Sequence, residues 1–383
     1  MSYLKLNRYD YYIIVPFIIV LILTAILMAL IQSNYFDADK LQPKDQLISV
    51  VATSITPPDS SIQIGAYIDN IYNLSINNKT FDANGWVWVT WPEKVEDFFQ
   101  ARKLTPDKWL NFANEIDNWD FKLEQFHDAP IKLKNGHFRQ GFKFSGHFYL
   151  NDISFYKYPF ETLNIPLIFE LTDFSEIKTD KSIHDLYLIP DQSTSGVGSY
   201  IDLTGYNTVA FNVFSKIHIY GSSFGSEIME TKPISTNQVI FQTTYKQSTN
   251  AALLTQFLPL TIVMLLVLLS PMLSSSLWDV RLSVPPTALL TLVFLQLGYR
   301  EKLPDIAYIT FIDSIYNCCY LVILIIFVLF LWGSNKINLA TESEKALLIE
   351  QIDLIDKRFQ LAIPAIMIII ILFAWIRVNH LHP

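Results

Sequence analysis

Six side chains between Ser283 and Glu301 repeat at the spacing of one helix face. They stand 4, 3, 4, 3 and 4 residues apart, which in a helix brings all of them to the same side. The six are Ser283, Thr287, Leu290, Phe294, Leu297 and Glu301. Hydroxyl oxygens can replace part of an ion's hydration shell, and an apolar constriction can stop ions by excluding water. By its residue types alone, the row fits either an ion pathway or an ordinary buried helix with incidental Ser and Thr.

Acidic residues stand at both ends of this row. Asp279 precedes Arg281 by two residues, and Glu301 closes the far end. Carboxylates near a narrow passage favour cations, so Asp279 and Glu301 would act as selectivity residues if the row lines an ion pathway. Arg281 opposes this preference if it faces the ions, although a long side chain can snorkel toward lipid headgroups. Alternatively, Asp279 and Arg281 pair with each other or with a neighbouring subunit and set no selectivity.

Other kinds of chemistry find little support in the residues. A membrane enzyme would need a nucleophile–base pair or a metal cluster, and the His-Glu-x-x-His pattern of zinc hydrolases does not occur. The formal net charge of −8 disfavours a nucleic-acid partner. Cys318 and Cys319 are the only cysteines, and adjacent helix positions point about 100° apart, so they cannot pair with each other. We expect no enzyme, no metal and no cofactor.

Four apolar segments in the last third of the chain must position the row. The predicted spans are 251–273, 282–299, 306–332 and 361–377. A spanning helix needs about 20 apolar residues, and 282–299 is the least apolar of the four, which suggests protein or water as its neighbour. Pro285 and Pro286 lie near its start, and a proline pair inside a helix removes hydrogen bonds. We therefore expect that helix to begin near Val284, after a non-helical collar of residues 279–283.

The N-terminal part, residues 1–34, predicts a cytoplasmic stub and a membrane anchor. Its apolar run Tyr11–Ile31 follows Lys5 and Arg8, and no small-x-small cleavage site follows, which favours an uncleaved anchor over a signal peptide. The positive-inside rule then places the N-terminus in the cytoplasm and residues 35–250 outside. A cytoplasmic loop (333–360) and an outer tail (378–383) complete a multi-pass protein of the plasma (inner) membrane.

Residues 35–250 read as a β-sandwich. Short runs rich in Val, Ile, Phe, Tyr and Trp alternate with turn formers. The expected strands include Gln63–Tyr67, Trp86–Trp91, Gly141–Phe148, Leu163–Leu171, Tyr206–Tyr220 and Val239–Tyr245. A period of two puts Trp86 and Trp88 on one face and Val87 and Val89 on the other. One helix is expected at Thr105–Trp119.

Three motifs resemble those of pentameric ligand-gated ion channels, the Cys-loop receptor superfamily. The run Leu303–Asp313, followed by Cys319-Tyr320, resembles the linker and third span of that family. The Asp356-Lys357 pair before Pro364 and Trp375 resembles the entry to the fourth span, and Tyr158–Glu161 resembles the tip of the loop that names the superfamily. The two cysteine positions of that loop carry Asn151 and Ile165, so the loop's disulfide is absent, as in the prokaryotic branch of the family. The resemblance covers residues 60–377.

The resemblance implies a homopentamer whose six-residue row surrounds a pore. It implies a gate at Leu290 and Phe294, permeant monovalent cations, and lipid around the outer helices. Residues 75–79 and the loop tip would face the linker 298–305, and Lys246 would pair with Glu161 or Asp82. The implied coupling residues are Tyr158, Pro159, Phe160, Glu161, Lys246, Leu303 and Pro304.

The agonist is a small molecule or protons. The family's binding positions fall on Trp86, Thr172 and Phe224, an incomplete aromatic box that disfavours a quaternary amine. Trp86 as a core residue is an equal alternative. Proton gating is open because His127, His137, His147, His184 and His218 lie in the outer domain. The alternative to a channel is a non-conducting membrane sensor with the same fold.

Overall fold

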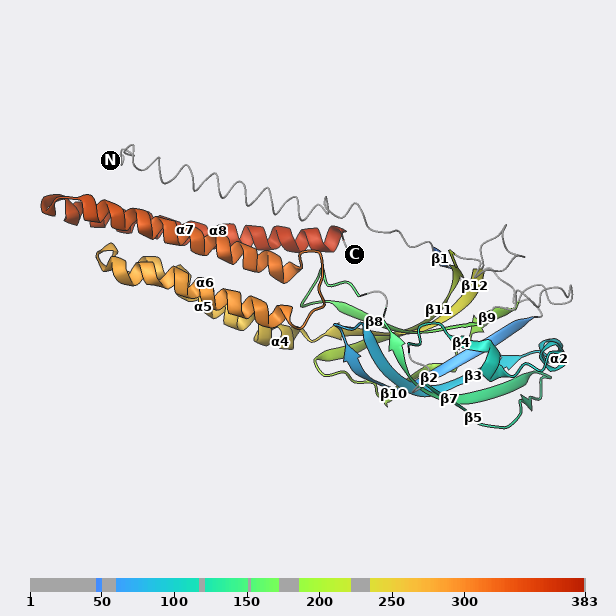
Figure 1. The fold of residues 1–383 in the computed structure, drawn as a ribbon. Coiled ribbons are helices and arrows are strands. Elements are labelled where there is room, and N and C mark those ends of the chain that lie inside the picture. Colours follow the sequence, from blue (N-terminus) through green and yellow to red (C-terminus); the bar gives the residue numbers. More distant parts are fainter. Residues whose placement is uncertain are drawn as a thin grey trace. The chain divides into compact units, whose positions relative to one another are not determined.

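The computed structural model describes residues 46–49, 60–116, 121–150, 153–171, 186–221 and 235–381. These residues form two compact units (Figure 1). The helical unit contains Ser154–Glu161 and the chain from Thr249 onward, and the β unit contains the strands on either side of Ser154–Glu161. The expected N-terminal anchor lies outside the described residues.

The β unit consists of two sheets. One has five strands in the order β1-β11-β12-β8-β4, and the other has the path β10-β2-β3-β7-β5, with β6 on β7 and β9 on β2. The first sheet contains β1 (Gln46–Ser49), β4 (Leu110–Phe112), β8 (Thr162–Leu171), β11 (Tyr206–Ile219) and β12 (Ser235–Gln247). The second contains β2 (Ser61–Ser75), β3 (Thr80–Trp91), β5 (Lys122–Gln125), β6 (Ile131–Lys132), β7 (Phe138–Tyr149), β9 (Tyr187–Pro190) and β10 (Gly196–Tyr200). The strands expected from the sequence are confirmed.

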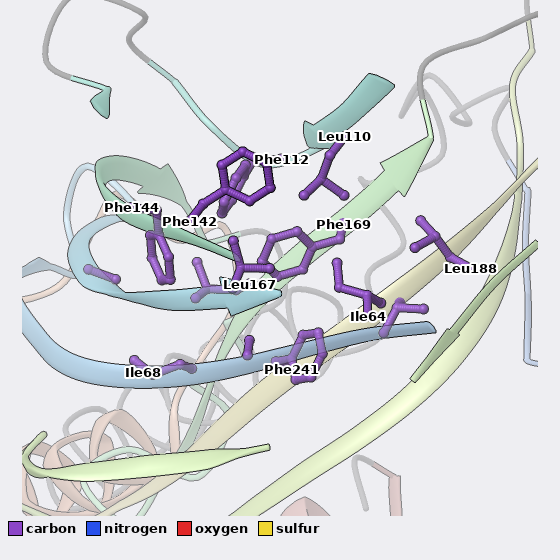
Figure 2. Packing of buried hydrophobic residues seen from close by; sticks show 14 of the residues in the cluster. Ile64, Ile68, Leu110, Phe112, Phe142, Phe144, Leu167, Phe169, Leu188 and Phe241 are labelled. Carbon is purple, nitrogen blue, oxygen red and sulfur yellow. The ribbon is translucent and has the colours of Figure 1, made fainter. Parts of the chain in front are cut away.

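Side chains buried at every second position form one core between the two sheets, which makes a sandwich. Along β3 every second residue is buried, including Val87 and Val89, whereas Trp86 and Trp88 point to the other face. Ile64 and Phe142 of one sheet share a single core with Phe169 and Phe241 of the other (Figure 2). Burying such side chains stabilises a fold by about 1.5–3 kcal/mol each, so this shared core holds the sheets together without a disulfide.

The helix expected at Thr105–Trp119 is wrong. In the described part of this segment, residues 105–116, a single helical turn forms, α3 (Pro106–Trp109), and the chain continues as strand β4, which pairs with β8. Trp109 is fully buried and stacks on Phe99 at a ring-centroid distance of 4.8 Å. Phe99 belongs to α2 (Glu93–Ala101), a helix that the sequence reading did not predict. Core packing of Trp109 and the pairing of β4 therefore override the local helix pattern.

Among the residues that the structure describes, the helical unit contains four helices long and apolar enough to cross a membrane. The first comprises α4 (Thr249–Ala252), a π-helical turn (Leu253–Phe257) and α5 (Leu258–Leu269). The others are α6 (Trp278–Arg300), α7 (Phe311–Leu339) and α8 (Glu342–Leu381). Figure 1 draws them in orange to red.

The expected loop 333–360 is mostly helical. Helix α7 runs on to Leu339, and α8 begins at Glu342. Its 40 residues make α8 about 60 Å long, whereas a bilayer core is about 30 Å thick. Apolar composition identifies only the part of a helix that lies in lipid. The charged first half of α8 was therefore predicted as part of a loop.

Helix α6 passes through both prolines, so the expected non-helical collar is also wrong. The helix starts at Trp278, directly after a 3₁₀ turn at Ser275–Leu277. Proline removes a backbone donor, but membrane helices tolerate it where neighbouring helices and Ser or Thr side chains hold the backbone. Here the turn before the prolines is held by Arg281, which is buried and paired with Asp356 of α8.

Candidate functional site

The six predicted residues lie on one exposed side of α6. Ser283, Thr287 and Glu301 are exposed, and Leu290, Phe294 and Leu297 keep 57%, 64% and 53% of their surface accessible. Such exposure of large apolar side chains is unusual on a soluble surface and marks a face made for lipid, for another chain or for a dry passage. The helical period thus brings the six residues together as expected.

The opposite side of α6 packs inside the unit. Its buried residues are Arg281, Pro285, Ala288, Leu292 and Tyr299. Each stands two positions from a member of the exposed row, which is about 200° around a helix. Helices α5 and α7 pack against α6. Packing within one chain therefore leaves the six-residue row available.

The hydroxyl hydrogens near the Asp279 end of the row turn back onto the helix. Ser283 Oγ donates to the carbonyl oxygen of Val280 at 2.8 Å, and Thr287 Oγ1 donates to that of Ser283 at 2.8 Å. A hydroxyl has one hydrogen and two lone pairs, so the lone pairs remain for other partners. Exposed oxygen acceptors of this kind can coordinate a cation.

The two charged residues at this end point in different directions. Asp279 is exposed, whereas Arg281 is 3% exposed and forms an ion pair with the fully buried Asp356. The guanidinium also lies over the Phe330 ring of α7, 4.2 Å from its centroid. Within the chain, Arg281 therefore pairs with Asp356 and not with Asp279, the partner considered from the sequence. Its charge is neutralised away from the exposed row.

The other end of α6 is clamped by a buried carboxylate. Asp313, in the first turn of α7, accepts hydrogen bonds from Tyr299 and from Arg300, whose Nη2 lies 2.6 Å from Asp313 Oδ2. Asp313 and Thr310 also form a reciprocal capping box that starts α7. Leu303, in the connection between these helices, is buried and Pro304 is half-buried. Asp313 therefore ties the end of one helix to the start of the next.

The loop tip Tyr158–Glu161 packs on this clamp within the helical unit. Tyr158 stacks on Tyr299 with ring centroids 6.0 Å apart, and Phe160 stacks on Phe257 at 5.6 Å. Phe160 also meets Trp375 of α8 edge-on at 5.9 Å. Burial and then the Glu161 carboxylate raise the pKa of Tyr158 to about 12, so its hydroxyl stays protonated at neutral pH. The expected contact between the tip and the 298–305 linker is present.

The structure also describes the surroundings of Trp86, Lys246 and Asp82 in the β unit. Trp86 lies on the sheet face turned away from the core; it packs on Phe126, and Lys143 Nζ lies 5.6 Å from its ring centroid. Thr172 and Phe224 lie outside the described residues. Lys246 is exposed on β12. The Asp82 carboxylate, one partner expected for it, instead lies 2.5 Å from His147 Nδ1.

A buried carboxylate on the five-stranded sheet escaped the sequence reading. Glu170 of β8 is 7% exposed and accepts hydrogen bonds from neighbours on β4, β12 and the end of β11. The donors are Asn111 Nδ2, Tyr220 OH, Thr236 Oγ1 and Gln238 Nε2, at 2.8–3.2 Å. The one signal was an acidic residue in an apolar strand. This cluster anchors the strands that lead into the β11–β12 connection.

A second carboxylate, Asp191, organises the loop between β9 and β10. It accepts hydrogen bonds from Ser193 Oγ at 2.8 Å, from Thr194 and from Trp88 Nε1 at 3.3 Å. Burial by itself would raise the pKa of Asp191, but the hydrogen bonds from Thr194, Ser193 and Trp88 outweigh it, and the pKa is lowered. The ionised carboxylate therefore holds Trp88 flat on the sheet, over Gly65.

The described residues offer no assembled catalytic or metal site. No group of His, Cys, Asp and Glu side chains suited to a metal ion occurs among the described residues. Residues 221–225 do match the letters Gly-x-Ser-x-Gly. That motif activates serine at a turn from a strand to a helix, and residues 222–225 lie outside the described residues.

Comparison with models of known protein families and with curated protein sequences finds no match.

Proposed function

We propose that this protein is a cation-selective ion channel, assembled from five copies of the chain and opened by a small molecule or by protons. In this proposal α6 lines the pore, and the β unit lies outside the plasma (inner) membrane. The observation that carries it is the exposed row on α6. Around a water-filled axis, polar and acidic positions of such a row would attract cations, and its apolar middle would form a gate.

The charges near the row support selection of cations. Asp279 is exposed, and the Arg281 charge is paired with Asp356 on the buried side of the helix. The Ser283 and Thr287 hydroxyls donate inward and so offer lone pairs outward. Copies of this face around an axis would present carboxylates and hydroxyl oxygens at one end, which attract cations and replace part of their hydration.

The apolar middle of the row supports gating at Leu290 and Phe294. Both side chains are more than half exposed, so a ring of copies would bring them to the axis without unpacking the helix. A narrow apolar ring excludes water, and ions cannot cross a dry constriction. Tilting or rotating α6 would widen such a ring.

The aromatic contacts support coupling through Tyr158. Its ring stacks on Tyr299, which donates to Asp313. A movement of the loop tip would therefore reach the end of α6 through packed side chains. Pairing of Lys246 with Glu161, and contact of residues 75–79 with the linker, stay predictions.

The surroundings of Trp86 bear on the ligand. The Lys143 ammonium already lies over its ring. An organic cation would have to displace this lysine, which agrees with an agonist that is not a quaternary amine. Protons remain a second possibility, and the His147–Asp82 contact is the first place to test it.

Recording under a salt gradient tests the proposal. The purified full chain is placed in planar bilayers, and the pH on one side is stepped from 8 to 4. We expect current that reverses near the cation equilibrium potential, and reversal near the anion potential would contradict the roles of Asp279 and Glu301. Silence would leave an unknown agonist or a non-conducting sensor. Leu290→Ser in the same assay separates these two, because it should open a channel at rest and cannot create current in a sensor.

A further inference from the structure

The charged first half of α8 carries one face that grips the start of α6. Ile349, Asp353 and Asp356 stand 4 and 3 residues apart, so they share a helix face. The Asp353 Oδ1 atom accepts from the backbone nitrogen of Ser275 at 2.9 Å, and the Ile349 carbonyl accepts from Ser275 Oγ at 3.3 Å. Asp356 pairs with Arg281. We call this face of α8, with Ser275 and Arg281, the α8 grip.

The grip is placed to fix the direction of Asp279. Ser275 lies four residues before Asp279 and Arg281 two residues after it, so both flanks of that turn are held by the same helix. Residues two positions apart point to nearly opposite sides of a helix. As long as Arg281 stays in its buried site, Asp279 must stay on the exposed side.

The ion pair of the grip is buried, so losing either partner would disturb the start of α6. Arg281 is 3% exposed and Asp356 is fully buried. Removing one partner of a buried ion pair leaves the other charge without compensation, which is strongly unfavourable. Arg281 would therefore leave its site for water or headgroups, and its positive charge would approach the exposed side beside Asp279. The first turn of α6 would rotate with it.

We propose that α8, through Asp353 and Asp356, is a positioning element for the acidic end of the ion pathway. This rests on the proposed channel function. Helix α8 carries many exposed apolar side chains further along, among them Ile368, Ile369, Leu372 and Phe373. A helix that faces lipid thereby sets the geometry at the selective end of the pore helix without contacting an ion. Asp353 and Asp356 are positioning residues in this scheme.

The test compares Asp356→Asn with Glu350→Gln. Both changes remove one negative charge from the same helix, but Glu350 is exposed and makes no contact in the grip. In reversal-potential measurements we expect Asp356→Asn to lower the cation-to-anion permeability ratio several-fold and Glu350→Gln to leave it unchanged. Asp353→Asn, which removes only the contact to Ser275, should shift the ratio in the same direction by less and serves if Asp356→Asn does not fold.

A second readout does not depend on current. A nitroxide is attached at Asp279→Cys in a chain whose Cys318 and Cys319 are replaced by alanine, and its electron paramagnetic resonance line shape is recorded in lipid. Adding Asp356→Asn should narrow the lines at residue 279, and a label at Glu301→Cys should keep its line shape.

The two readouts separate the two proposals. Unchanged permeability in a conducting channel, or an unchanged line shape at residue 279, would overturn the α8 grip. If neither the unsubstituted chain nor Leu290→Ser conducts, the channel function fails, and the line shape still decides whether α8 positions the Asp279 turn.

Discussion

Replacing Leu290 by serine should hold the proposed channel open or make it far easier to open. The leucine is 57% exposed in the single chain, so roughly half of its side chain remains to be covered when copies close around an axis. Full burial of a leucine is worth about 1.5–3 kcal/mol, so closing contributes about 1 kcal/mol per subunit. Five subunits give about 5 kcal/mol, and since each 1.4 kcal/mol is tenfold, the closed state loses roughly several thousandfold in population.

The matched control is Leu289→Ser. Leu289 is 42% exposed, so the same chemistry changes on a side chain of similar accessibility, but it points about 100° away from the row. Both variants are recorded in bilayers at rest and during the agonist or pH step. We expect resting current or strongly increased sensitivity for Leu290→Ser and little change for Leu289→Ser. Equal effects, or a larger one at Leu289, would refute the assignment of the pore-facing side.

Three further perturbations follow from the carboxylates. Asp279→Ala should move the reversal potential toward zero under a salt gradient, because one acidic ring is lost; an unchanged potential would remove Asp279 from the selectivity residues. Asp191→Asn should lower the thermal unfolding midpoint of the full chain at neutral pH. The pKa of Asp191 is lowered in the folded protein, so its ionised carboxylate stabilises the fold at pH values above the unfolded pKa of about 4. This stabilisation is lost as the pH falls through the folded pKa. The unfolding midpoints of Asp191→Asn and of the unsubstituted chain should therefore converge in acid. Glu170→Ala should lower the midpoint by several degrees because it leaves buried donors such as Tyr220 OH without an acceptor, and an unchanged midpoint would show that water replaces the carboxylate.

Periodicity in the sequence was enough to predict which residues share a face. The helical period brought Ser283 through Glu301 to one side of α6, and the period of two separated Trp86 from Val87 on β3. These predictions succeed because the geometry of a single element depends only on residue spacing. Apolar length likewise predicted four helices able to span a membrane. None of these inferences needs knowledge of a distant residue.

The sequence reading failed where a distant part of the chain decides the local structure. Trp109 reads as part of a helix, but its place in the core and the pairing of β4 with β8 end that helix after one turn. The pair Pro285-Pro286 reads as a helix start, but α6 extends two turns further because Arg281 is held from α8. Both outcomes depend on packing energies that local propensities do not contain.

Partners far apart in the chain were decided only by the tertiary structure. Arg281 and Asp356 are 75 residues apart, and Glu170 collects donors from three other strands. Residue types and spacing predict that a carboxylate or guanidinium needs a partner once it is buried, because an unpaired buried charge is costly. They do not say which residue will supply it, since that depends on which helices and strands pack side by side. The identity of the exposed row therefore came from the sequence, and the direction of the charges beside it came from the fold.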